Sequence, residues 1–136
     1  MEFQNYQKYR WFFTSNGKLV VGGKSDDQNE LVIKNFLRPS YVVMHTSLPG
    51  SPFMILLDDK PDKKDLEETA IFCASFSKQW KNGKKQIGID VFKGSQIYKT
   101  GRMKTGTFGV KGDKKTLDVK PGLVLIIQKG KIKAVP

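Results

Sequence analysis

Short apolar runs separated by turn residues are the feature that most constrains the fold of this chain. From residue 86 to the C-terminus, the apolar residues fall into short runs bounded by glycine, lysine or proline. Such runs indicate strands, because a strand needs only a few residues, whereas an average helix has about three turns. The predicted strands of this half lie at 87–92, 96–99, 105–110, 115–119, 123–128 and 131–135. The last two form a hairpin across Lys129-Gly130.

The first half combines strands with two helices. Strands are predicted at 8–13, 18–21, 41–45 and 53–57, and Asn16-Gly17 predicts a two-residue hairpin turn between the first two. Ser25 and Gln28 form a capping box that begins a helix at 26–37, which Pro39 ends. A second helix is predicted at 62–81, where these residues share one apolar face: Leu66, Ala70, Cys73, Ser77 and Trp80.

These elements predict an α+β fold, with two helices packed on a mixed, largely antiparallel sheet of several short strands. The length of 136 residues is that of one domain, so residues 1–136 are expected to form a single domain. No internal repeat or linker interrupts the chain.

The positive charge is concentrated in the second half of the chain. The net charge is +11, and residues 76–136 hold 15 of the 24 Lys and Arg residues but only three of the 13 acidic ones. An excess of charges of one sign opposes folding, because the charges repel one another in the compact state. Such an excess of positive charge is typical of a surface that binds a polyanion. Nucleic acid is the expected polyanion, because the basic residues lie among glycine-rich strands and not on an amphipathic helix, which would indicate a membrane.

The strongest candidate site is the stretch 93–115, where cations alternate with glycines and with the aromatic residues Tyr98 and Phe108. Cations neutralise phosphates, glycines let backbone N–H groups approach them, and aromatic rings stack on unpaired bases. The alternative is a solvated hairpin with both rings in the core. The predicted RNA-binding residues are Arg10, Lys24, Lys93, Tyr98, Lys99, Arg102, Lys104 and Lys111, with Lys18 extending the surface.

His45 is the only histidine and forms a second candidate site with Gly50 and Ser51, where a tight Pro-Gly turn exposes backbone beside a titratable ring. Catalysis would require a nucleophile next to that ring, and Ser47 and Ser51 are near in sequence. The alternative is a histidine at the end of a strand that is satisfied by backbone hydrogen bonds.

Three other motifs are expected to be structural. Gly23-Lys24-Ser25 lacks the first glycine of a phosphate-binding loop, because Lys18 stands there, and this argues against an NTPase. Cys73 is the only cysteine and faces the predicted core, so neither a disulfide nor a reactive thiol is expected. The acidic residues before the second helix suit a helix start better than a calcium loop: Asp58, Asp59, Asp62 and Asp65. Neither a metal nor a cofactor is expected.

Several segments, taken in order, resemble one family. The first are Trp11-Phe-Phe-Thr-Ser-Asn-Gly17, Val21-Gly-Gly-Lys24 and Gln28-Asn-Glu-Leu31, followed by YVVMHTSLPGSP at 41–52. Next come Thr69-Ala-Ile-Phe-Cys-Ala-Ser75 and Trp80, and then Gln96-Ile-Tyr-Lys99, Gly106-Thr-Phe108 and Gly112. In this order and spacing, over about residues 9–128, they resemble the NFACT-R domain, the RNA-binding module of the NFACT proteins of ribosome-associated quality control.

The lone cysteine, with no membrane-spanning run and no apolar signal-peptide core in the sequence, leads us to expect a cytoplasmic location. The resemblance implies a free-standing RNA-binding protein that acts on structured RNA, either rRNA or tRNA, with the large ribosomal subunit as a further partner. Neither a membrane partner nor a preference for DNA is expected. The other NFACT domains do not fit in 136 residues, so their tail-adding and tRNA-recruiting activities are not carried over. No enzymatic activity is expected. Two alternatives stay open: an RNA-modifying enzyme or accessory factor of tRNA modification that uses the His45 region, and a protein–protein module that docks on a ribosomal or modification-enzyme partner.

Overall fold

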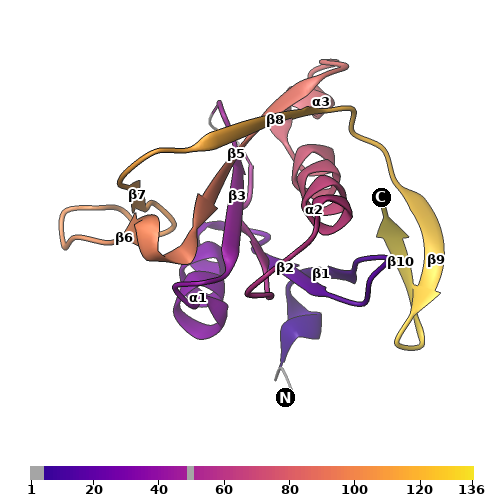
Figure 1. Ribbon diagram of the computed structural model, residues 1–136, viewed down its shortest axis with the longest axis horizontal. Helices are drawn as coiled ribbons and strands as arrows, with labels where there is room; N and C mark the ends of the chain where they lie inside the picture. Colours follow the sequence, from indigo (N-terminus) through magenta and orange to yellow (C-terminus); the bar gives the residue numbers. More distant parts are fainter. Residues whose placement is uncertain (1–4, 49–50) are drawn as a thin grey trace.

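The structure is a computed structural model that describes residues 5–48 and 51–136. Its centre is a six-stranded sheet with the strand order β1-β2-β4-β3-β5-β8 (Figure 1). These strands are β1 (Arg10–Phe13), β2 (Leu19–Gly22), β3 (Val42–Thr46), β4 (Met54–Leu56), β5 (Ile87–Lys93) and β8 (Lys115–Val119). Two small sheets flank it, formed by β6 (Ile97–Tyr98) with β7 (Gly109–Val110) and by β9 (Val124–Gln128) with β10 (Lys131–Val135). Short 3-10 helices, η1 (Tyr6–Lys8) and η2 (Gly94–Gln96), precede β1 and β6.

Helices cover both faces of the central sheet, and every strand pair among the described residues is antiparallel, which confirms the predicted α+β fold. α2 (Lys63–Ser75) packs on one face, and α1 (Asp26–Phe36) packs on the other (Figure 1). Successive side chains of a strand point to opposite faces, so β2 and β4 are buried at every residue. None of the helices that the structure describes is long and apolar enough to cross a membrane.

The predicted helix at 62–81 is two helices. α2 ends at Ser75, and α3 (Lys78–Lys81) begins after Ser77, whose extended backbone (φ −89°, ψ 154°) interrupts the helix. The Ser77 hydroxyl accepts a hydrogen bond from the Trp80 N–H and caps the new helix. This break redirects Trp80, which is 40% exposed, so the expectation that Trp80 lies in the core is wrong.

The two predicted hairpin turns differ in outcome. The β9–β10 turn at Lys129-Gly130 has positive φ at both residues, 52° and 74°, and confirms the two-residue prediction. In the first hairpin, the Thr14 N–H donates to the Lys18 carbonyl (2.8 Å), and the Gly17 N–H donates to the Thr14 carbonyl (2.8 Å). Gly17 has a φ of 79° and is the only positive-φ residue of this turn. The loop therefore consists of residues 15–17, and the two-residue prediction is wrong here.

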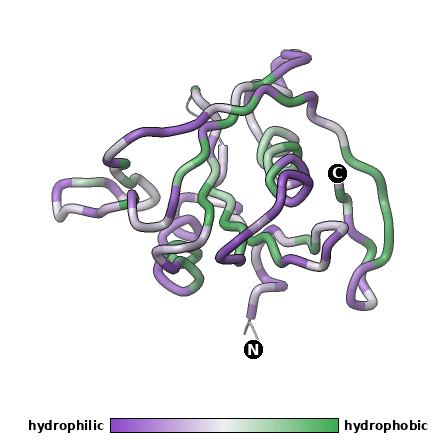
Figure 2. Tube along the Cα trace, viewed as in Figure 1, coloured by the Kyte–Doolittle hydropathy of each residue, from purple (hydrophilic) through white to green (hydrophobic). Residues whose placement is uncertain are grey.

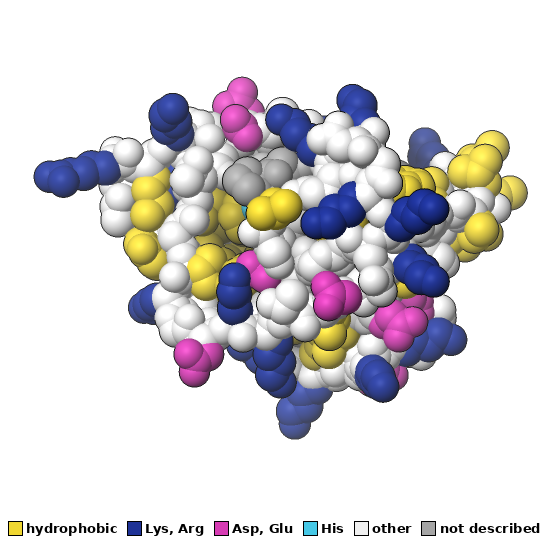
Figure 3. Space-filling model, turned by 90° about the horizontal axis from the view of Figure 1, so that it is seen from above, with side chains coloured by type: hydrophobic (Ala, Val, Ile, Leu, Met, Phe, Trp, Pro, Cys, Tyr) yellow, Lys and Arg dark blue, Asp and Glu magenta, His cyan; other side chains and the backbone are white. Residues whose placement is uncertain are grey.

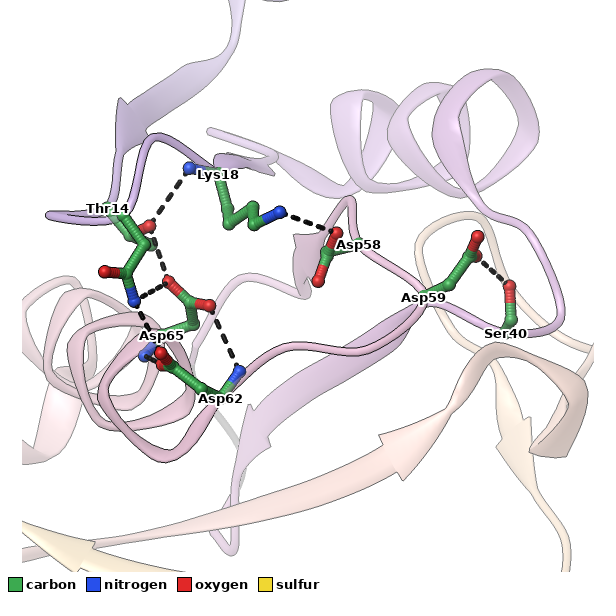
Figure 4. A network of polar contacts seen from close by, with 8 residues as sticks. Thr14, Lys18, Ser40, Asp58, Asp59, Asp62 and Asp65 are labelled. Atoms are coloured by element: carbon green, nitrogen blue, oxygen red, sulfur yellow. Dashed lines mark hydrogen bonds and ion pairs between the residues drawn. The ribbon is translucent and has the colours of Figure 1, made fainter.

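A polar network joins the first hairpin to the start of α2 (Figure 4). The Asp65 carboxylate accepts hydrogen bonds from the Thr14 hydroxyl (2.8 Å), the Asn16 amide (3.1 Å) and the Asp62 N–H (3.1 Å). Asp62 in turn accepts from the Asp65 N–H (2.9 Å), which completes a capping box. Although burial opposes ionisation, these donors hold the pKa of Asp65 below its ordinary value.

The same network accounts for the acidic residues before α2. Asp58 forms an ion pair with Lys18 (3.2 Å), and Asp59 accepts a hydrogen bond from the Ser40 hydroxyl. Within the described part of the chain, no group of three or more acidic, histidine or cysteine side chains could hold a metal ion. Asp62 and Asp65 thus begin α2, as the helix-start interpretation predicts, whereas Asp58 and Asp59 connect other elements of the fold through Lys18 and Ser40.

Replacing Asp65 by alanine is expected to lower the free energy of unfolding by about 2–3 kcal/mol, because the buried Thr14 hydroxyl loses its acceptor and α2 loses half of its capping box. Urea denaturation followed by circular dichroism measures the change. Glu67→Ala, an exposed change in the same helix, is the matched control and is expected to alter stability by less than about 0.5 kcal/mol. Equal effects of the two variants would contradict the structural role of the network.

Candidate nucleic-acid interface

A cleft of about 740 Å³ lies at one end of the central sheet, where β2 and β3 end and β4 begins. The strand ends bring Gly23, His45 and Phe53 to its lining. The remaining walls come from the start of α1, the segment 106–108 and the turn between α2 and α3. Figure 3 looks onto this face, where hydrophobic side chains lie in a hollow and Lys and Arg side chains are distributed around it.

Aromatic rings form one wall of the cleft. Phe53 lies between His45, at 4.7 Å between ring centroids, and Phe108, at 5.5 Å. The Phe53 and Phe108 rings meet edge to face, which aromatic pairs prefer. Phe53 is almost fully buried, whereas Phe108 is half-buried, so Phe108 is the ring that a ligand in the cleft can reach.

His45 is held as a neutral ring by its surroundings. Burial lowers its pKa, and this outweighs the opposing effects of the Thr46 backbone, the Asp90 carboxylate and the Ser51 backbone. The Nδ1–H donates to the Thr46 carbonyl (2.9 Å), which requires the proton to lie on Nδ1. The Ser47 hydroxyl donates to Asp90 (2.7 Å), and the Ser51 hydroxyl accepts from the Thr46 N–H (2.9 Å). Among the described residues, neither of these serine hydroxyls hydrogen-bonds the ring.

The single imidazole is expected to titrate with a midpoint below 6.5, because burial favours its neutral form. Since the folded state binds this proton more weakly than the unfolded state, lowering the pH through 6.5 favours unfolding at this site. An NMR titration of the ring protons measures the midpoint without assignment, as the chain has one histidine. A midpoint at 6.5 would mean that the ring is solvated, and a midpoint above 6.5 that a carboxylate stabilises its charged form.

Three cations line the cleft: Arg10, Lys24 and Lys78. The Arg10 guanidinium lies 4.2 Å from the centroid of the Phe76 ring, and burial lowers its pKa. Its Nε atom is buried without a hydrogen-bond partner among the described residues, and so is the Oδ1 atom of Asn29, which also lines the cleft. Buried polar atoms without partners cost free energy, so these two atoms favour a polar ligand in the cleft.

Two acidic residues line the cleft, Asp26 and Asp90, and Asp90 is compensated by its neighbours. Asp90 accepts hydrogen bonds from Lys114 (2.9 Å), Ser47 (2.7 Å) and Thr116 (3.1 Å). Burial opposes its ionisation, but these donors hold the pKa of Asp90 below its ordinary value. Its charge therefore persists and is compensated by Lys114. Asp26, at the start of α1, offsets part of the positive charge of Arg10, Lys24 and Lys78, so the cations of the lining outnumber its uncompensated acidic residue.

Contacts of Lys99 hold the loop between β6 and β7 against α1. The Lys99 ammonium forms an ion pair with Glu30 (2.5 Å), donates to the Thr107 carbonyl (2.7 Å) and lies 4.8 Å from the centroid of the Phe108 ring. The Gly106 N–H donates to the same Glu30 (2.9 Å), and a Cβ atom on Gly106 would lie only 2.7 Å from the Cα of Asp26. Lys99 thus positions Phe108 at the cleft, whereas the sequence predicted a phosphate contact.

The other predicted residues fall into separate places. Arg102 and Lys104 are exposed on the β6–β7 loop and do not line the cleft, to which this loop contributes Gly106, Thr107 and Phe108. Lys93 and Lys111 are exposed at the opposite end of the sheet, where Lys93 pairs with Val42. Tyr98 is 42% exposed, and its ring lies against Gly109, which has no Cβ atom to obstruct it.

The second candidate site is part of the same cleft. His45 and Ser51 both line it, while Gly50 lies outside the described residues.

Cys73 is fully buried, and burial raises its pKa to about 12, which confirms the core interpretation. Sequence reasoning did not select Phe53, Phe76 or Lys78 for the site. Their residue types do not indicate a binding site, because a phenylalanine in a strand is usually a core residue and a lysine at a helix end usually stabilises the helix.

Comparison with known proteins identifies relatives of this chain. Residues 8–112 match the family model described as the NFACT protein RNA-binding domain. The archaeal Rqc2 homolog aRqcH of Methanocaldococcus jannaschii is 34% identical over 115 residues, which cover 80% of this chain and 17% of that protein. The ribosome quality control complex subunit NEMF homolog of Drosophila melanogaster is 29% identical over 119 residues, covering 82% of this chain and 12% of that protein.

Two further comparisons extend this picture. Ribosome quality control complex subunit 2 of Schizosaccharomyces pombe is 28% identical over 133 residues, covering 92% of this chain and 13% of that protein. The chain thus spans less than a fifth of the length of these relatives. The C-terminal part of the fibronectin/fibrinogen-binding protein from Streptococcus suis has the same fold, with a TM-score of 0.74 at 23% identity over 89% of this chain and 48% of that one.

Proposed function

The chain belongs to the family of NFACT protein RNA-binding domains, and on that premise we propose that it binds structured RNA through the cleft at the end of its sheet. The cleft receives one unpaired nucleotide, and the cations around it neutralise the neighbouring phosphates. The observation that carries this proposal is the meeting, in one cleft, of the reachable Phe108 ring with Arg10, Lys24 and Lys78. Aromatic stacking with backbone neutralisation is the general chemistry of binding single-stranded RNA.

Five cations are proposed to contact phosphates. Arg10, Lys24 and Lys78 line the cleft, and Arg102 and Lys104 extend the surface along the β6–β7 loop. Lys99 is left out because Glu30 compensates its charge. If about five phosphates are engaged, a plot of the logarithm of the binding constant against the logarithm of the salt concentration is expected to have a slope of about −3.5 for a single strand. Raising the salt concentration from about 50 to about 200 mM then lowers the affinity by roughly 100-fold. A slope near zero would contradict phosphate neutralisation.

The target is proposed to be rRNA or tRNA on a ribosomal particle, with the large subunit as the docking partner. The support comes from the relatives, which are named as Rqc2 or ribosome quality control proteins. In-cell crosslinking followed by RNA sequencing is expected to recover rRNA or tRNA positions with unpaired nucleotides. Recovery confined to messenger RNA would contradict this target.

Phe108→Ala is expected to lower affinity for an RNA hairpin with a single-stranded loop by roughly 5- to 150-fold, because stacking of one base on an aromatic ring contributes about 1–3 kcal/mol. Fluorescence anisotropy measures binding of this hairpin and of a fully paired duplex of equal length. The duplex offers no unpaired base, so its affinity is expected to change little.

Tyr98→Ala is the matched control, since Tyr98 is an exposed aromatic residue outside the cleft lining. It is expected to bind the hairpin as the unchanged protein does. Equal losses in both variants, or a loss for hairpin and duplex alike in Phe108→Ala, would contradict insertion of a base into the cleft.

A further inference from the structure

The C-terminal hairpin, β9 with β10, carries most of the exposed large apolar side chains of the described residues. Figure 2 shows it as a hydrophobic segment at the periphery of the molecule. It follows residue 112, where the family match ends, and it has no part in the cleft. Its exposure therefore has no explanation in RNA binding.

One face of the hairpin holds it to the body of the protein. The Gln128 side chain accepts from the Phe13 N–H (2.8 Å) and donates to the Phe13 carbonyl (2.9 Å) at the edge of β1. The Lys133 ammonium lies 4.1 Å from the Trp11 ring centroid, and Val135 is buried. These side chains alternate along the strands, as a single face requires. The hairpin thus has a fixed orientation and covers the edge of β1.

The opposite face is apolar and open. Leu125, Ile127 and Ile132 lie on it and are 74%, 72% and 75% exposed. Ile127 pairs directly with Ile132 across the hairpin, and Leu125 pairs with Ala134, so the four side chains form one continuous patch. Isolated exposed leucines are ordinary, but a contiguous patch of this kind marks an interaction surface.

β9 also offers a free strand edge. In the two-stranded sheet β9 pairs only with β10 among the described residues. The pair that flanks a two-residue turn, here Gln128 with Lys131, is a hydrogen-bonded pair, and such pairs alternate along antiparallel strands. Leu125 and Ile127 therefore direct their backbone N–H and C=O groups away from β10. An open edge with these groups is the template for addition of a strand.

Charge indicates what kind of strand fits this edge. No acidic residue occurs between residues 119 and 136, while Lys120, Lys129, Lys131 and Lys133 lie there. Lys131 and Lys133 lie on the face opposite the apolar patch, because they pair with Gln128 and Ile126. The Lys129 and Lys133 ammonium groups lie over the Phe13 and Trp11 rings, so one face of the hairpin is cationic and the other is apolar. We propose that β9 docks an extended, acidic segment of a partner protein, which adds a strand to the β9 edge, places aliphatic side chains on the apolar face and directs carboxylates toward the lysines.

Two other occupants fit these observations less well. A second copy of this chain would bring another +11 of charge and the same lysines to the contact. A lipid surface would leave the outward N–H and C=O groups of Leu125 and Ile127 without hydrogen-bond partners in hydrocarbon. An acidic strand satisfies both the backbone groups and the charge.

The probe for this proposal is a short fluorescein-labelled peptide of alternating glutamate and valine, and the control peptide has lysine in place of glutamate. Fluorescence anisotropy is expected to show binding of the acidic peptide to the full chain and binding at least about tenfold weaker for the lysine peptide.

The paired change Leu125→Ser and Ile132→Ser is expected to lower the affinity for the acidic peptide by at least about 100-fold, since two buried aliphatic contacts are lost without a change in charge. Both residues are exposed, so folding is not at risk.

Leu31→Ser, on an exposed leucine of α1, is the matched control and is expected to leave peptide binding unchanged. By NMR, the peptide is expected to slow amide exchange at Leu125 and Ile127 but not at Ile126, whose N–H already faces β10. Affinity for the hairpin RNA is expected to stay the same in the paired variant, which separates this proposal from RNA binding. The proposal is overturned if the acidic peptide does not bind or still binds the paired variant. It is also overturned if the paired change instead abolishes self-association in sedimentation or binding to anionic vesicles.

Discussion

Neutralising the three cleft cations in one variant, Arg10→Gln, Lys24→Gln and Lys78→Gln, is expected to weaken binding of the hairpin-loop RNA by on the order of 500-fold at about 50 mM salt. Each contact to a single strand releases about 0.7 of a counterion, which corresponds to roughly an eightfold gain in affinity at this salt concentration. Three of the five proposed phosphate contacts therefore account for most of the electrostatic part of the expected affinity. The log–log salt slope is expected to change from about −3.5 to about −1.4, because two phosphate contacts remain.

The matched control removes the same charge elsewhere. Lys60, Lys63 and Lys64 are exposed and lie at and before the start of α2, beyond the end of β4 that is opposite the cleft. Their replacement by glutamine is expected to lower affinity by only a few fold, through the long-range field alone. If both triple variants lose affinity equally with equal slopes, the protein binds RNA through its net charge and the cleft is not the site.

Phe72→Ala is expected to lower the free energy of unfolding by about 3–5 kcal/mol, because a buried phenylalanine is lost and a cavity remains. Phe72 is 2% exposed, and its ring centroid lies 4.3 Å from that of Phe12 on the sheet and 4.9 Å from that of Phe76. It therefore joins α2 to the sheet and also supports Phe76, on which the Arg10 guanidinium rests. Urea denaturation measures the loss, and RNA affinity is expected to fall together with it.

Trp80→Ala is the informative comparison for Phe72→Ala. Both residues lie in the segment that the sequence predicted as one amphipathic helix, but Trp80 is 40% exposed after the break at Ser77. Its removal is expected to cost less than about 1 kcal/mol. A loss as large as that of Phe72→Ala would mean that the helix continues and that Trp80 is part of the core.

Particular residues show where sequence reasoning succeeded. Ser25 caps α1, and Lys129-Gly130 adopts the predicted two-residue turn. The predicted capping box is only half formed, because the Gln28 side chain accepts from the Lys24 N–H and not from Ser25. These features depend on residues that are neighbours in sequence, so local stereochemistry suffices to predict them. The break at Ser77 was missed because the apolar spacing of 62–81 continues across it.

The candidate site was predicted only in part, for a related reason. Lys99 was selected as a phosphate contact because its segment is basic, but its ammonium is paired with Glu30 of α1. The Gly106 N–H donates to the same carboxylate across 76 positions of sequence. A contact of this range depends on the packing of the loop on the helix, and no pattern within either segment indicates it.

The amino-acid sequence by itself determined the types of the elements, the antiparallel character of the sheet, the concentration of positive charge in the second half and the family, because these depend on short-range pattern and composition. Only the tertiary structure decided which cations stay free and which are compensated, that Phe53 and Phe108 meet beside His45, and that the outer face of β9 and β10 stays open. The physical reason is that a side chain acquires its exposure, its partners and its pKa from elements that are distant in sequence and that meet only when the sheet and helices pack.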